Sequence, residues 1–114
     1  MAKIKTTQKE IKSTYTNVVA IGYCNLQNLL NYFTPQYYTV RKEGWASDVY
    51  DFGTTAISTG YAPFGNIRID YDTLQKYDKI GETLRYDSVL TWQAKKKKAK
   101  ELIEKMIKEA IKSK

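Results

Sequence analysis

The chain has 114 residues, of which 42% are apolar and 27% charged, and this size and composition suit one soluble domain with its own core. Histidine is absent and Cys24 is the single cysteine, which excludes histidine-based catalysis, histidine-based or cysteine-rich metal sites and an internal disulfide. The longest apolar run, residues 18–21, is too short to span a bilayer, and the charged N-terminus lacks the apolar core of a secretory signal, so we expect a cytoplasmic protein.

The first 35 residues contain two predicted helices and one predicted strand. The capping-box pattern TQKE predicts a short helix over about residues 7–15. The compact, partly β-branched run at 18–21 predicts a short buried strand. Apolar residues then recur at helical spacing until Pro35, which predicts a helix over about 25–33 with one apolar face: Leu26, Leu29, Leu30 and Phe33.

Between Gln36 and Tyr61 the hydrophobic period changes to that of strands. The strings YYTV, WASDVYDF and TTAISTGY are rich in β-branched and aromatic residues and are separated by glycines. They predict three antiparallel strands, with a hairpin at residues 51–54 and a turn at 62–66.

Two further helices complete the chain. Asp72 is placed as the cap of a helix whose apolar face recurs every three or four residues, with Gly81 as a weak point inside it: Leu74, Tyr77, Ile80 and Leu84. A basic helix follows at about residues 88–113. The expected fold is therefore α+β: residues 1–114 form a single domain, in which an antiparallel sheet of three strands, or four with residues 18–23, packs with N-terminal and C-terminal helices.

The net charge of +7 is concentrated at one end of the chain. Residues 1–94 carry 10 basic and 9 acidic side chains, whereas residues 95–114 carry 9 lysines and 3 glutamates. A helical projection puts Lys95 and Lys96 beside an apolar stripe, while the other lysines lie on a face that also holds glutamates. Because only three arginines are present, bidentate reading of bases is not favoured. The candidate residues for binding a partner or a nucleic acid are Lys95, Lys96, Lys97, Lys98 and Lys100.

Aromatic residues make up 13% of the chain, and six of them cluster in and around the predicted strands. Such rings form protein interfaces or stack on single-stranded nucleic acid, although rings in a small sheet also form its core. The candidate aromatic interface consists of Tyr37, Tyr38, Trp45, Tyr50, Tyr61 and Phe64.

No catalytic pattern is found in the sequence. Phosphate-binding glycine loops are absent, and Cys24 lacks a histidine base, so a buried structural thiol is favoured over a nucleophile. The aspartates at 48 and 51, and at 70 and 72, make poor metal pairs. We expect no catalytic residue, no metal and no cofactor, and therefore a protein that is not an enzyme.

Four segments carry a resemblance to a family of small proteins encoded on phages and conjugative elements of Gram-positive bacteria. They are IGYCNLQNLL (21–30), EGWASDVYDFG (43–53), TAISTGYAPFGNI (55–67) and YDTLQKYD (71–78), which cover about half the chain. The resemblance carries over no functional residue. It implies a protein of a mobile element, and small proteins from that setting often resemble anti-CRISPR proteins in size and context.

The leading hypothesis is therefore a non-enzymatic inhibitor, an anti-CRISPR protein that binds a type II CRISPR effector nuclease and blocks cleavage of target DNA. The alternative is a nucleic-acid-binding accessory or regulatory protein that uses the lysine-rich helix for phosphate contacts to guide RNA or DNA. A structural homodimer joined through the terminal helix is the third hypothesis, so that a monomer and a homodimer both remain open.

Overall fold

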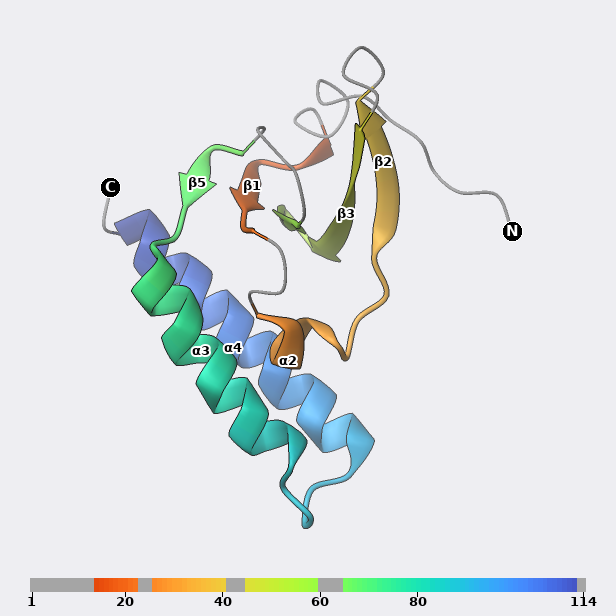
Figure 1. Cartoon of the computed structure of the whole chain (residues 1–114), viewed down its shortest axis with the longest axis vertical. Coiled ribbons are helices and arrows are strands. Elements are labelled where there is room, and N and C mark those ends of the chain that lie inside the picture. The colour runs from red at the N-terminus through yellow and green to blue at the C-terminus, as the bar shows by residue number, and fades with distance from the viewer. Residues whose placement is uncertain (1–13, 23–25, 41–44, 60–64, 113–114) are drawn as a thin grey trace. The chain divides into compact units, whose positions relative to one another are not determined.

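A computed structural model describes residues 14–22, 26–40, 45–59 and 65–112, with the backbone alone at 37–40 and 45–46 (Figure 1). Its elements are β1 Asn17–Ala20, α2 Gln27–Leu30, β2 Gln36–Val40, β3 Trp45–Phe52, β4 Thr55–Ser58, β5 Ile67–Arg68, α3 Tyr71–Arg85 and α4 Trp92–Lys112. The α+β class is confirmed. The predicted helix at 7–15 and Cys24 lie outside the described residues.

The chain forms two compact units, each built from two separate segments. The first unit comprises Met1–Cys24 and Pro35–Arg68, and the second comprises Asn25–Thr34 and Ile69–Lys114. Among the described elements, the strands belong to the first unit, and the helices α2, α3 and α4 belong to the second. That the whole chain acts as one domain stays a prediction.

The sheet of the first unit has the strand order β2-β3-β4-β1-β5. The three strands expected between Gln36 and Tyr61 are confirmed as β2, β3 and β4, and they pair in the antiparallel sense. The hairpin between β3 and β4 turns at Gly53, whose φ of 83° suits glycine, and the N–H of Gly53 donates to Asp51 Oδ1 at 2.9 Å.

The fourth strand, β1, is also confirmed, but the expectation of a fully antiparallel sheet is corrected. β1 runs parallel to both β4 and β5, with Val18 opposite Ala56 and Val19 opposite Ile67, so the sheet is mixed. Antiparallel pairing was inferred from short hairpin links, whereas β1 and β4 are joined by a long crossover, which permits parallel pairing. A buried apolar run alone gives no strand direction.

The start of β5 is fixed by the turn before it. Asn66 bonds twice to Val18: its side-chain Oδ1 accepts from the backbone N–H of Val18 at 2.7 Å, and its own N–H donates to the Val18 carbonyl at 2.9 Å. A Cβ added at Gly65 would lie 2.7 Å from the Cβ of Ala20, so only glycine allows this close approach. The buried side chains of the sheet include Val18, Val19, Val49, Ile57 and Ile67.

In the second unit, α3 begins earlier than its expected cap. Asp70, not Asp72, is the N-cap, and its Oδ1 accepts from the backbone N–H of Thr73 at 2.7 Å. Asp70 has the extended backbone that a cap requires, while Asp72 lies in the first turn, where a carboxylate suits the helix dipole. Leu74, Tyr77 and Leu84 are buried as expected, whereas Ile80 is 38% exposed.

The helix α2 is much shorter than the expected 25–33, and α3 supplies its cap. No side chain of its own N-cap residue bonds its first turn. Instead, Asp78 Oδ1 accepts from the backbone N–H of Asn28 at 3.0 Å. Gly81 is more than a weak point in α3, because a Cβ there would lie 2.8 Å from Cγ of Leu29. The glycine therefore lets α2 approach α3 closely.

The helix α4 begins at Trp92 and not near Ser88. Thr91 Oγ1 accepts from the N–H of Ala94 at 3.2 Å and closes the first turn. Of the expected apolar stripe, Ala99, Ile103 and Met106 are fully buried, whereas Trp92, expected on the same side, is 55% exposed. Among the described residues no helix combines the length and the apolar composition that a membrane crossing needs.

Candidate functional site: the tip of the helical hairpin

The helices α3 and α4 run antiparallel as a hairpin, and the residues 85–98 at its closed end are named here the hairpin tip (Figure 1). Three large apolar side chains are exposed within seven consecutive residues of it: Tyr86 at 72%, Val89 at 86% and Trp92 at 55%. The guanidinium of Arg85 lies 5.6 Å from the ring centre of Tyr86, and the ring of Trp92 lies 4.7 Å from that of Tyr32. Trp92 is thus packed against another ring, and Tyr86 lies beside a cation.

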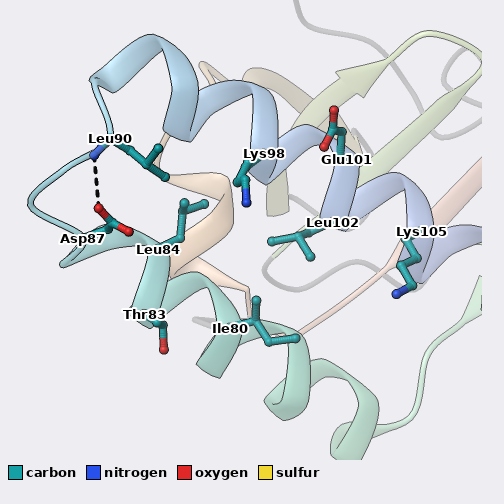
Figure 2. A pocket seen from close by; sticks show the side chains of 9 residues that line it. All are labelled: Ile80, Thr83, Leu84, Asp87, Leu90, Lys98, Glu101, Leu102 and Lys105. Carbon is teal, nitrogen blue, oxygen red and sulfur yellow. Dashed lines mark hydrogen bonds between the residues drawn. The ribbon is translucent and has the colours of Figure 1, made fainter.

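Asp87 bonds the backbone of the loop at the tip. Its Oδ1 accepts from the backbone N–H groups of Val89 at 2.8 Å and Leu90 at 3.0 Å, and Figure 2 shows the second of these bonds. The bonds from Leu90 and Val89 lower the pKa of Asp87, and the charges of Lys95 and Lys98 act in the same direction. Val89 is therefore held out to solvent by an ordered turn.

The lysine run divides into two groups, because successive residues of a helix point about 100° apart. Lys95 and Lys98 lie on the side of Asp87, and we call them the inner lysines. Lys96, Lys97 and Lys100 are exposed and share another side of α4, and we call them the outer lysines. The five candidate lysines therefore do not form one patch.

Lys95 makes a structural contact. Its Nζ donates to the main-chain carbonyl of Arg85 at 2.8 Å, at the C-terminal end of α3, where free carbonyls attract a positive charge. Lys95 was expected beside the apolar stripe, and this bond explains how an ammonium is accommodated there. The outer lysines and the exposed inner lysine Lys98 hold the charge that remains available to a partner.

The candidate aromatic interface is described only in part. Tyr37 and Tyr38 belong to β2 and Trp45 to β3, where the structure describes the backbone alone, and Tyr61 and Phe64 lie outside the described residues. Tyr50 is 8% exposed, and burial raises its pKa, with the negative charge of Asp48 adding to the effect. Tyr50 offers little surface to a partner. An interface role for the group stays a prediction.

Sequence reasoning missed Tyr86 and Val89. The start of the last helix was placed near Ser88, so Val89 was counted as a helical residue. Two signals could have found the loop: Asp87-Ser88 is a common turn pair, and Thr91 is a good N-cap immediately before Trp92. Either would have moved the helix start and left Val89 in a loop.

The described residues contain no group of three or more histidine, cysteine, aspartate or glutamate side chains placed to hold a metal ion. The side chains that the tip presents to solvent include ammonium, guanidinium, aromatic and aliphatic groups, which are the groups that bind other molecules, while the Asp87 carboxylate accepts two backbone hydrogen bonds. No family model matches the chain, and neither a curated protein nor a solved structure shows significant similarity to it.

Proposed function

We propose that the protein is a non-enzymatic binding protein that docks the hairpin tip on a macromolecular partner. In its sharpest form it is an inhibitor from a phage or mobile element, an anti-CRISPR protein that binds a type II effector nuclease in the cytoplasm and prevents cleavage of target DNA. A basic inhibitor of this kind would meet the guide RNA or an acidic protein surface, and would not imitate DNA.

One observation carries the proposal: Tyr86, Val89 and Trp92 are exposed together at one end of the helical hairpin, next to the outer lysines. Tyrosine and tryptophan are the residues that most often dominate interface energies, and a ring of charge around them guides association. An exposed apolar cluster beside lysines is typical of an interface and is unfavourable on a surface that stays in water. The nuclease as partner comes from the resemblance alone.

The test is a cleavage assay with a purified type II effector nuclease, its guide RNA and a target duplex. Wild-type protein should suppress cleavage near an equimolar ratio, and Tyr86→Ala or Val89→Asp should require at least about tenfold more protein, which corresponds to about 1.4 kcal/mol. Tyr71→Ala is the matched control, because Tyr71 is 62% exposed and lies at the opposite end of α3. Absence of inhibition at large excess across several such nucleases would reject the inhibitor.

A second function is favoured by the outer lysines. Lys96, Lys97 and Lys100 lie on one exposed side of α4, which suits contact with the phosphates of a nucleic acid, and Tyr86 could stack on a base. An accessory protein of this kind should bind RNA or DNA with an affinity that falls steeply with salt. Alanine at Lys96 and Lys97 should weaken this binding to a similar extent for all sequences.

A further inference from the structure

A groove runs between α3 and α4, on the side of the hairpin that α2 does not cover (Figure 2). Asp78, Gly81 and Arg85 of α3 face α2, since they bond or closely approach Asn28 and Leu29. Ile80 and Thr83 project from the other side of α3 by helical periodicity, and they line the groove. Its volume is about 510 Å³.

The floor of the groove is aliphatic. Ile80 and Leu84 come from α3, Leu90 from the loop and Leu102 from α4. Leu84 is nearly buried, Leu90 and Leu102 are half-buried, and Ile80 is 38% exposed. The helical hairpin thus has an apolar strip between two helices that no described element of the second unit covers.

Four charged side chains line the groove, two lysines and two carboxylates, but only the lysines are placed to contact a bound molecule. Lys98 and Lys105 reach from α4 toward α3 in Figure 2, and they are seven residues apart, which places them about 10 Å from each other along the helix. Asp87 is occupied by two backbone N–H groups. The carboxylate of Glu101 turns away from the apolar floor in Figure 2. The groove therefore offers two ammonium groups above an aliphatic floor.

From this geometry we infer that the groove binds an amphipathic helix of the partner, which presents aliphatic side chains to the floor and carboxylates to Lys98 and Lys105. Two helical walls accept a third helix by ridge-into-groove packing, and the spacing of the lysines matches two turns of such a helix. The inference rests on the proposed function, since the helix belongs to the partner, and it adds the chemistry of the segment that is bound.

The test uses the full-length protein and designed peptides, and no nuclease. The probe is a fluorescein-labelled peptide of about 14 residues, with leucine at every third or fourth position and glutamate beside the leucines, which is long enough for about four turns. A second peptide has lysine in place of every glutamate. Fluorescence anisotropy should show the acidic peptide binding at least about tenfold more tightly than the basic one.

A charge exchange provides the decisive comparison. The double variant Lys98→Glu/Lys105→Glu should reverse the preference and bind the basic peptide more tightly. The control Lys108→Glu/Lys112→Glu makes the same change in net charge on α4 at two exposed lysines that do not line the groove, and it should keep the wild-type preference. Ile80→Glu should weaken both peptides, and circular dichroism should confirm that each variant retains its helices.

The inference is overturned if the wild type does not prefer the acidic peptide, or if the control variant reverses the preference equally. It is also overturned if the protein self-associates and Lys98→Glu/Lys105→Glu abolishes that association, because a second copy would then occupy the groove. If the peptide preference reverses as expected but no nuclease is inhibited, the groove proposal stands and the inhibitor proposal is rejected. If a nuclease is inhibited but neither peptide is preferred, the groove proposal alone is rejected.

Discussion

The lysine run lies where a helix least favours it. Lys95 closes the first turn of α4 and Lys96 opens the second, and the first turn contains no acidic residue that would match the positive end of the helix dipole. Lys96 also stands four residues before Lys100, so the two like charges repel each other. Solubility alone would be served by lysines at the other end of the helix, which supports a binding role for the outer lysines.

Lys96→Glu is expected to stabilise the protein while it weakens partner binding. The change replaces a repulsive pair with an attractive one between the new carboxylate and Lys100, and it should raise the free energy of unfolding by about 0.5 kcal/mol. Urea unfolding measures the gain, and the cleavage assay measures the loss. The control Lys97→Glu alters the net charge equally but faces Glu101 one turn later, so it should weaken binding without the gain in stability.

Lys95→Ala is expected to act on stability, because the Lys95 ammonium bonds the Arg85 carbonyl at 2.8 Å. Its loss should lower the free energy of unfolding by about 1 kcal/mol. Lys97→Ala, at an exposed position of the same run, should change the free energy of unfolding by less than about 0.5 kcal/mol. Equal effects of the two variants in urea unfolding would show that the Lys95 bond contributes nothing.

Acid should loosen the hairpin tip through Asp87. Hydrogen bonds from Leu90 and Val89 lower the pKa of Asp87 in the folded state, so this carboxylate contributes stability above its unfolded pKa of about 4. That contribution is lost as the pH falls through the lowered folded pKa. Between about pH 5 and pH 2, urea unfolding should therefore show a smaller loss of stability for Asp87→Asn than for the wild type. An equal loss of stability in the wild type and in Asp87→Asn over this pH range would contradict a role for the Asp87 charge.

At the scale of elements, Gly81 is the position where two helices meet. Alanine favours a helix by about 1 kcal/mol over glycine, yet Gly81→Ala should destabilise the protein because the new methyl group would lie 2.8 Å from Leu29 Cγ. In a Leu29→Ala background the same change should be neutral or stabilising, since the obstacle is removed. Urea unfolding of the wild type, the two single variants and the double variant tests this. A stabilised single variant Gly81→Ala would show that α2 moves aside readily.

The sequence predicted those elements whose patterns are local. The period of Leu74, Tyr77 and Leu84 identified α3, and the hairpin at Gly53 was recognisable from its length. The parallel direction of β1 and the short length of α2 depend on contacts with distant residues, such as Asp78 capping Asn28, and no local pattern contains them. Propensity sets where an element forms, while tertiary contacts set where it ends.

At the scale of the whole molecule, the sequence located the charge but not the site. The excess of lysine at residues 95–114 was evident from counting, whereas the division into inner and outer lysines required the position of Asp87 and the Arg85 carbonyl. The exposed Val89 was hidden by a helix start placed too early, near Ser88. The groove could not be predicted from the sequence either, because its walls come from two helices whose facing sides are fixed only by packing.

The two kinds of group at the tip should affect different rate constants of complex formation with the proposed partner, the effector nuclease. Long-range charge accelerates association and is screened by salt, whereas buried apolar contacts slow dissociation. The double variant Lys96→Ala/Lys97→Ala should therefore lower the association rate about tenfold at low salt and flatten its salt dependence, with little change in dissociation. Val89→Ser should do the reverse, since Val89 is 86% exposed and would be buried only in the proposed complex. Surface plasmon resonance at low and high salt separates the two effects. If the lysine variant changes dissociation alone, the outer lysines form direct contacts in the complex and do not act by steering.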